Sequence, residues 1–174
     1  MKEQSMDEVV VAEYDPSWPV RFVEEAERIR QVIGDNFAAT AHIGSTAVPG
    51  LAAKPIIDIM VGVHSLGAAN ASVPAMEALG YSYWREDTMP KRLYFVKGLP
   101  PNGPRTHHVH LVERESDFWR THLLFRDYLR AHPGTAHDYA ALKQNLAEQF
   151  RSDREAYTDA KSEFIRNVMQ KATN

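Results

Sequence analysis

The sequence predicts an α+β protein, with a small mixed sheet, an N-terminal helix, and C-terminal helices packed on the sheet. Three observations predict this class. Residues 56–63, IIDIMVGV, are almost entirely apolar, as in a strand covered on both faces. Residues 18–33 repeat apolar side chains at helical spacing. The same spacing returns after residue 116 and replaces the strand pattern for the remainder of the chain.

The composition is that of an ordinary globular domain. The 174 residues include 20 Lys and Arg against 23 Asp and Glu, 44% are apolar, and none is Cys, which argues against a disulfide scaffold. No apolar run approaches the ~18 residues of a membrane span. The formal charge of −3 argues against a broad nucleic-acid surface. The acidic, polar start does not resemble a secretory signal, so we expect a cytoplasmic protein.

We expect residues 1–8 to be a flexible leader and residues 9–174 to form one domain. The first half alternates helices and strands between turn signals. In order, the expected elements are an extended arm at 9–11, a helix at 18–33, strands at 38–43 and 56–63, a helix at 67–79, and a strand at 81–84. Gly34 and Gly80 end the two helices, and Pro74 is a defect within the second.

The second half changes from strands to helices. Strands are expected at 92–97 and 106–113, and the Pro- and Gly-rich loop 98–104 predicts a hairpin-like reversal between them. Helices are expected at 118–132, 135–150 and 153–171.

A glycine-serine turn lies between the strands at 38–43 and 56–63. Gly44 would let a ligand approach the backbone closely, and Ser45 offers a hydroxyl and an N–H to a phosphate. Lys54 supplies a nearby cation. Asp58 interrupts the most apolar strand, where a carboxylate is costly without a metal, hydrogen-bond donors or an open cleft. The alternative is that the glycines only make turns and backbone donors satisfy Asp58.

Residues 42–59, HIGSTAVPGLAAKPIIDI, resemble the signature of the GrpB family, a bacterial group in the polymerase-β-like nucleotidyltransferase superfamily. The resemblance covers nearly the whole chain. It continues through YDPSWP (14–19), KRLYFVKG (91–98), RTHHVHLVE (105–113), HLLFRDYLRAHP (122–133) and AYTDAKSEFI (156–165).

The resemblance implies nucleotidyl transfer from a nucleoside triphosphate to a small-molecule acceptor. Gly44, Ser45 and Thr46 would contact phosphates, and two acids at alternate strand positions would hold Mg²⁺, or Mn²⁺ or Zn²⁺. Asp58 fills the first acid position, but the second is Met60, whose thioether is a poor ligand for magnesium.

The strand at 106–113 carries a second candidate group. His108 and His110 should share one face, with His107 and Glu113 on the other. If this strand neighbours Asp58, then Asp58, His108 and His110 could form a three-ligand metal site. Alternatively, one histidine, with His110 as the candidate catalytic residue beside Asp58, acts as a general base or contacts phosphate. The plain alternative is a pair of hydrogen-bonded histidines.

Two arginines flank the same strands. Arg92 and Arg105 are candidates for a nucleotide phosphate, because the guanidinium fork suits phosphate oxygens. Arg126 and Arg130 share a helix face with His122, and this polar stripe lines the cleft, tethers the helix to the sheet, or is a solvated face.

Three functions follow from these residues. The leading hypothesis is a nucleotidyltransferase-like enzyme acting with a nucleoside triphosphate, a divalent metal and a small-molecule acceptor. The second is a non-catalytic nucleotide- or metabolite-binding module, and the resemblance implies a link to coenzyme A metabolism, because some GrpB relatives are fused to dephospho-CoA kinase. The third is a mononuclear metalloenzyme that uses Asp58, His108 and His110. The base, the acceptor and the oligomeric state stay open.

Overall fold

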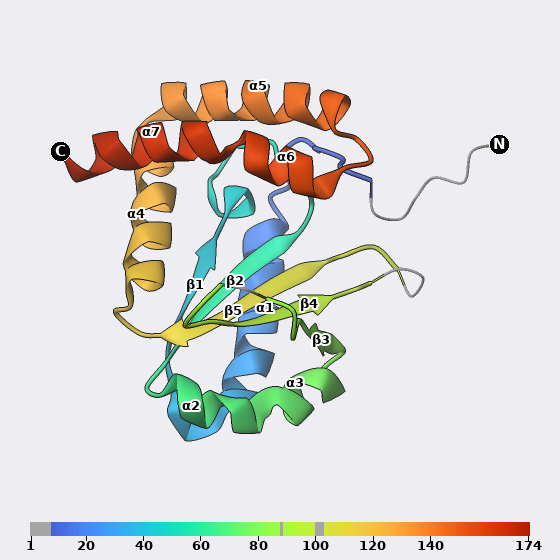
Figure 1. The fold of residues 1–174 in the computed structure, drawn as a ribbon, viewed down its shortest axis with the longest axis vertical. Helices are drawn as coiled ribbons and strands as arrows, with labels where there is room; N and C mark the ends of the chain where they lie inside the picture. The colour runs from blue at the N-terminus through green and yellow to red at the C-terminus, as the bar shows by residue number, and fades with distance from the viewer. Residues whose placement is uncertain (1–7, 88, 100–102) are drawn as a thin grey trace.

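The computed structural model describes residues 8–87, 89–99 and 103–174. Within them, one five-stranded sheet crosses the middle of the molecule (Figure 1). Its strands lie in the order β1 (Phe37–Ile43), β2 (Ile57–Val63), β5 (His107–Glu113), β4 (Leu93–Lys97) and β3 (Tyr81–Tyr83). β2 and β5 run parallel, and the other neighbouring strands are antiparallel. The predicted α+β class with a mixed sheet is confirmed.

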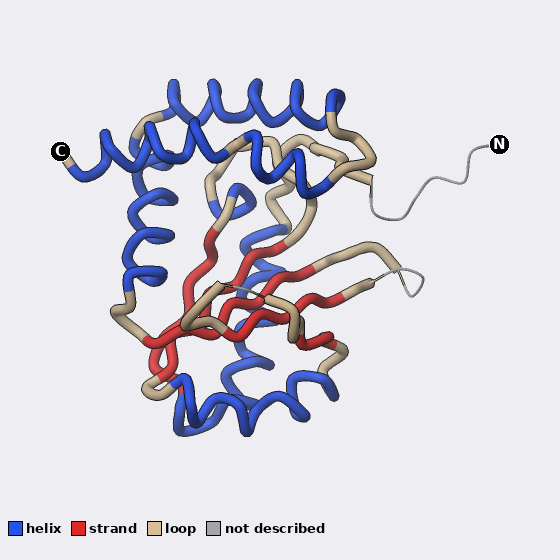
Figure 2. Tube along the Cα trace, in the orientation of Figure 1, coloured by secondary structure: helices blue, strands red, loops and turns tan. Residues whose placement is uncertain are grey.

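The helices form two groups on either side of the sheet (Figure 2). The first group is α1 (Trp18–Ile33), α2 (Leu66–Ala69) and α3 (Val73–Ala78). The second is α4 (Asp117–Ala131), α5 (Pro133–Gln149), α6 (Arg154–Ala160) and α7 (Ser162–Thr173). Short 3₁₀ turns lie at Gly34–Asn36 (η1), Ser45–Ala47 (η2) and Asn70–Ser72 (η3).

Alternation along the central strands separates the main core from the candidate site. On β2, the side chains at 57, 59, 61 and 63 are buried against α1 and α3, in the same core as Leu93 and Phe95 of β4 and Val109 and Leu111 of β5. The side chains at 58 and 60 point to the opposite face. Met60 packs there in a smaller core with Trp119 of α4, whereas Asp58 lies under α5 and α6, where the packing opens. A one-residue shift in register would exchange these faces.

Two expected helices are divided. Pro74 lies in the first turn of α3, so it begins a helix instead of distorting a longer one, and η3 separates α3 from α2. The long C-terminal helix expected at 153–171 is α6 and α7, which meet at Lys161. A proline is well accommodated at the start of a helix because its missing N–H has no partner there.

The hairpin-like reversal expected between residues 92–97 and 106–113 is present. β4 and β5 pair antiparallel, and residues 100–102 of the segment that joins them lie outside the described residues. Of the expected leader, residues 1–7 lie outside as well, and Glu8 accepts a hydrogen bond from Arg151 Nε at 3.1 Å. The arm at 9–11 leads to a single bridge between Ala12 and Ala53. None of the described helices has both the length and the apolar character to cross a membrane.

Candidate functional site

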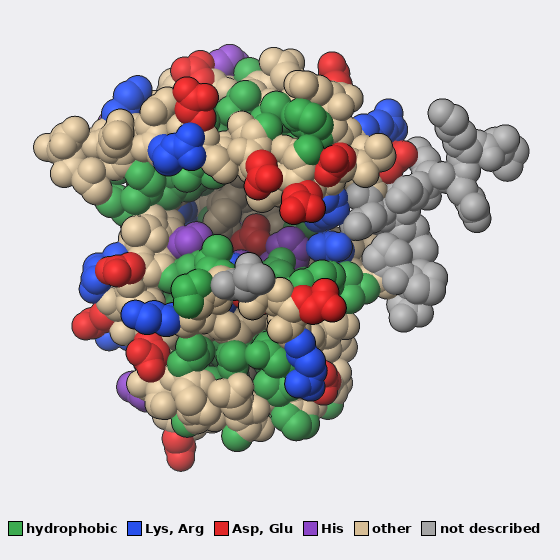
Figure 3. Space-filling view, in the orientation of Figure 1, with side chains coloured by type: hydrophobic (Ala, Val, Ile, Leu, Met, Phe, Trp, Pro, Cys, Tyr) green, Lys and Arg blue, Asp and Glu red, His purple; other side chains and the backbone are tan. Residues whose placement is uncertain are grey.

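A cavity of about 300 Å³ lies between the sheet and the C-terminal helices. Its sheet side is formed by the Gly44–Ser45 turn, Asp58 of β2, and His108 of β5. Figure 3 shows this face hollowed between the upper helices and the strands, with acidic and histidine atoms inside the hollow. The structure therefore brings the glycine-serine turn, the strand acid and one of the predicted histidines to a common surface.

Gly44 is required at its position for two physical reasons. Its φ of 71° and ψ of −175° belong to a region that is essentially restricted to glycine. In addition, a Cβ at this position would lie 2.5 Å from Asp58 Oδ2, closer than real side chains come. The carboxylate of Asp58 thus rests directly against the glycine backbone.

Two arginines of α4 hold this turn from its two ends. Arg126 Nη1 donates to the carbonyl of His42 at 3.1 Å, just before the turn. Arg130 donates from Nε and Nη2 to the carbonyl of Ala47 at 2.9 and 2.7 Å, at the end of η2. Of the expected roles for this polar stripe, Arg126 and Arg130 fulfil the tethering role.

Asp58 and His108 form a hydrogen-bonded pair. They face each other across the parallel register of β2 and β5, with His108 Nδ1 3.0 Å from Asp58 Oδ1. His110 Nε2 lies 3.9 Å from the same oxygen, so it is a near neighbour rather than a second hydrogen bond. Burial acts to raise the pKa of Asp58, but the bond from His108 and the nearby His110 ring outweigh it and hold the pKa well below its usual range.

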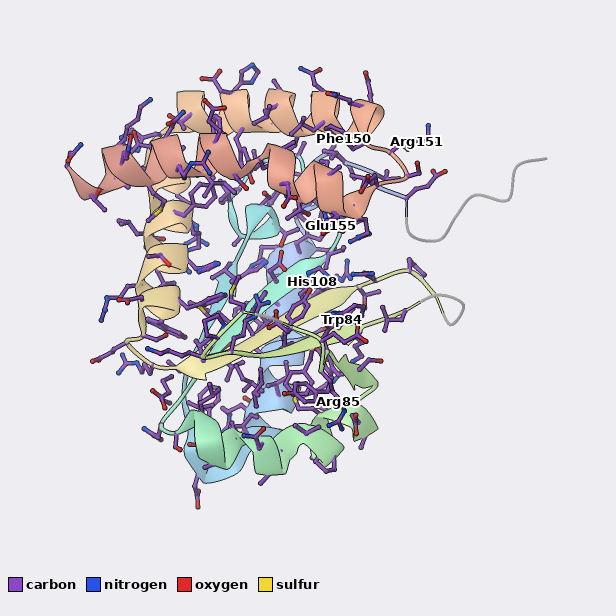
Figure 4. All side chains as sticks on the ribbon, viewed as in Figure 1. Trp84, Arg85, His108, Phe150, Arg151 and Glu155 are labelled. Carbon is purple, nitrogen blue, oxygen red and sulfur yellow. The ribbon has the colours of Figure 1, made fainter. Side chains whose placement is uncertain are left out.

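The ionised carboxylate determines the proton position on His108. Because a carboxylate only accepts hydrogen bonds, Nδ1 of His108 carries the proton, and Nε2 of the neutral ring has the lone pair. Nε2 is buried and has no hydrogen-bond partner in the described part of the chain. His108 lies on the sheet below α6 in Figure 4. Its free nitrogen is the group of this pair that can accept a proton.

His110 is held differently, by Arg92. The Arg92 guanidinium binds both oxygens of Asp87, at 2.8 and 2.6 Å, and its Nη1 lies 3.1 Å from His110 Nδ1. Arginine can only donate, so Nδ1 of His110 accepts and the proton of the neutral ring is on Nε2, toward Asp58. Burial lowers the pKa of His110 to about 4. The predicted base role of His110 stays a prediction, and Arg92 is committed to Asp87 and His110.

Of the other residues predicted to contact phosphate, some line the cavity and one does not. Ser45 and Lys54 line it. Thr46 also lies at its edge, but its hydroxyl bonds His42 Nε2 at 2.9 Å and the Ile56 carbonyl at 3.4 Å, which stabilises the turn. The Arg105 guanidinium lies over the Trp84 ring, 5.7 Å from its centroid, outside the set of residues that line the cavity.

The donor set at Asp58 does not fit a resident divalent metal. The second acid position is occupied by Met60, which is fully buried among the apolar residues near Trp119. Across the described ranges, no three His, Asp or Glu side chains are grouped to hold a metal ion. Asp58 Oδ1 and His108 Nδ1 are hydrogen-bonded to each other. The three-ligand set of Asp58, His108 and His110 is not among the groups found in the described residues, and it stays a prediction.

Five cavity residues come from the C-terminal helices and the junction between two of them. Tyr139 and Lys143 belong to α5, Tyr157 and Thr158 belong to α6, and Lys161 lies between α6 and α7. Tyr139 is 4% exposed, and burial raises its pKa despite an opposing hydrogen bond with Ser45. Helical spacing shows only that these residues share a face with apolar neighbours, so the side of the helix that lines a cavity is indistinguishable from one that lines a core.

This chain is similar to part of a dephospho-CoA kinase. The kinase of Mycolicibacterium paratuberculosis is 28% identical over 187 residues, a match that covers 91% of this chain and 44% of the kinase.

Family and structure comparisons agree with the fold described above. The GrpB protein family model matches residues 8–171. A UPF0157 protein of Pseudomonas aeruginosa is 45% identical over 168 residues, covering 95% of this chain and 68% of the relative. The crystal structure of the conserved protein GrpB from Enterococcus faecalis superposes with a TM-score of 0.87 at 38% identity, over 94% of this chain and 96% of the other. The chain belongs to the GrpB family.

Proposed function

We propose that the protein transfers a nucleotidyl group from a nucleoside triphosphate to a small-molecule acceptor. One observation carries the proposal: the Asp58 carboxylate rests against Gly44 and bonds His108 on the wall of a cavity. A glycine backbone that admits close approach is suited to a phosphate, and a histidine oriented by a carboxylate is suited to proton transfer. The placement of the family in the polymerase-β-like superfamily is part of the same proposal.

His108 Nε2 is covered in this structure, so in the proposed reaction the bound acceptor displaces the side chains over it, and Nε2 then accepts the proton of the acceptor hydroxyl. The acceptor oxygen bonds to the α-phosphorus as the bond from that phosphorus to the α–β bridging oxygen breaks, and pyrophosphate leaves. Asp58 stabilises the imidazolium that forms on His108, as the carboxylate of a catalytic triad does. No step is assigned to a divalent metal, because a single carboxylate that is already bonded to His108 does not form a site for one.

The test measures nucleotide binding and pyrophosphate release separately. Each of the four common nucleoside triphosphates is titrated by calorimetry, and pyrophosphate is then assayed with the small-molecule fraction of a bacterial extract as the acceptor source. Assays with and without Mg²⁺, Mn²⁺ or Zn²⁺ test the metal prediction. His108→Gln should retain binding and lose release by about 10²–10⁴-fold, the range of a general base.

His107→Gln is the matched control. It lies beside His108 on β5 but on the other face of the sheet, where its Nδ1 contacts the Thr106 hydroxyl at 2.9 Å. Release should be unchanged in this variant. Equal release by wild type and His108→Gln would refute the base role, and failure of all four nucleotides to bind would refute the function.

A binding module without turnover is the second candidate, and Met60 is the observation that favours it. A buried thioether at the second acid position lowers the metal affinity that nucleotidyl transfer normally needs. Similarity to part of a dephospho-CoA kinase makes dephospho-CoA and coenzyme A the additional probes for this candidate. Binding of a nucleotide or of either probe, without pyrophosphate release under any metal condition, would favour the module over the enzyme.

A further inference from the structure

Three lysines from three separate segments converge on the cavity. Lys54 follows the glycine-serine turn, Lys143 lies on α5, and Lys161 joins α6 to α7. Lys143 is 2% exposed, and its ammonium donates to the Ala52 carbonyl. Burying even one ammonium is costly without an anion nearby, so three around one cavity need an explanation.

The three amines lie against two tyrosine rings that line the same cavity. Lys54 Nζ and Lys161 Nζ lie 4.9 and 4.4 Å from the centre of the same Tyr157 ring. Lys143 Nζ lies 4.8 Å from the centre of the Tyr139 ring, the side chain that meets Ser45. Burial lowers the pKa of Lys54 and Lys143 to about 7 and that of Lys161 to about 8, and repulsion between the amines contributes to each shift except that of Lys161.

The surrounding charges leave the cavity positive. Besides the lysines themselves, Asp58, Arg105 and Arg154 are the charged groups that act on these amines. Asp58 is the one acid among the described residues that line the cavity, and its carboxylate is engaged by His108. In the described ranges, none of the three ammonium groups forms an ion pair with a carboxylate. The positive charge is therefore available to a ligand.

We infer that Lys54, Lys143 and Lys161 form a binding site for a chain of two or three phosphates. Several ammonium groups spread around a cavity match several charged groups in a row, whereas one carboxylate or one phosphate would leave part of the charge uncompensated. The tyrosine rings beneath the amines hold the lysine stems in place and add cation–π attraction. In the function proposed above, this site would hold the pyrophosphate that leaves, but the anion site stands independently of turnover.

The test uses inorganic phosphates, which isolate the anion from any nucleoside. Tripolyphosphate and pyrophosphate are titrated into the full chain by calorimetry, with orthophosphate and ATP as separate arms. We expect both polyphosphates to bind at least ten times more tightly than orthophosphate. ATP binding much more tightly than tripolyphosphate would identify a nucleotide as the ligand, and equal affinities would identify the polyphosphate alone as sufficient; both support the site.

Lys161→Met is the informative variant. The methionine keeps an apolar stem on Tyr157, and residue 161 is half-buried. The variant should weaken tripolyphosphate binding at least tenfold. Lys171→Met removes the same charge from an exposed position of α7 and should leave the affinity unchanged. Circular dichroism and thermal melting verify that both variants are folded. Equal weakening in the two variants, or no binding of either polyphosphate to the wild type, would overturn the inference.

Proton uptake gives a second readout. Because the amines have pKa values of about 7 to 8 in the empty cavity, an anion that requires them charged must raise those values and draw protons from solution. Titrations in two buffers of different ionisation enthalpy should report net uptake near pH 8 and weaker binding as the pH rises above this value. Tripolyphosphate binding without pyrophosphate release from any nucleotide would reject the transfer reaction and retain this site.

Discussion

Replacing Gly44 by alanine tests the contact on which the candidate site depends. The new Cβ would lie 2.5 Å from Asp58 Oδ2 and 3.2 Å from Asp58 Cβ, so the carboxylate or the turn must move. The backbone conformation at Gly44 costs a non-glycine residue about 1–3 kcal/mol by itself. Forcing an extra methyl group into packed surroundings adds about 1–3 kcal/mol.

Gly34→Ala separates these two costs. Gly34 also has a positive φ, 62°, with a ψ of −136°, but no atom lies within 4 Å of the position its Cβ would take. The free energy of unfolding should therefore fall by about 1–3 kcal/mol more in Gly44→Ala than in Gly34→Ala. Urea unfolding followed by tryptophan fluorescence measures this difference, because Trp18 and Trp119 are buried.

A double-mutant cycle assigns the additional loss to Asp58. In an Asp58→Ala background the nearest oxygen is absent, so Gly44→Ala should cost at least about 1 kcal/mol less than in the wild type. Gly34→Ala should cost the same in both backgrounds. Equal losses for the two glycines, together with no coupling between Gly44 and Asp58, would refute the contact and the convergence built on it.

Three further results are expected. The His110 ring protons should titrate near pH 4 in NMR spectra, because burial lowers its pKa to about 4; a midpoint near 6.5 would contradict that environment. Arg92→Met should cost about 1–3 kcal/mol in urea unfolding, since it leaves the half-buried Asp87 carboxylate, 13% exposed, without its partner. Adding Asp87→Leu should recover most of this loss, and a cost below about 0.5 kcal/mol would contradict the half-buried pair. The Lys143 pKa is about 7 in the folded protein against 10.5 ordinarily, so the unfolded chain binds more protons between these values and stability rises with pH. Lys143→Met should reduce the rise of unfolding free energy with pH. An unchanged slope would contradict the lowered pKa of Lys143.

Strand alternation explains why the sheet side of the site was predictable. An acid at residue 58 in an otherwise apolar strand must leave the core, and histidines two residues apart must share a face. What local sequence does not contain is the pairing of β2 with β5, since their fifty-residue separation includes two other strands. The structure supplies that adjacency, and it shows Asp58 bonded to His108 and Arg92 in contact with His110.

The helical side was not predictable, for a different reason. Lys143 lies on α5, where apolar and polar residues are not clearly separated onto opposite faces of the helix. Its partners are the Ala52 carbonyl and other residues far away in the chain. Lys161 lies where the expected continuous helix is divided, so its direction depends on a break that local periodicity does not reveal. Similarly, the Asp87 that engages Arg92 lies in a loop, where no repeating pattern identifies a partner.

The hydrogen bonds from Arg126 and Arg130 to the carbonyls on either side of Gly44 affect the free energy of ligand binding at this turn. A loop that samples many shapes must lose conformational entropy when it closes around a ligand, which weakens binding. Here helix α4 has already removed that freedom during folding, so the turn is preorganised. Affinity at this surface should then depend on the charges that meet the ligand, with little lost to rearranging the peptide that receives it.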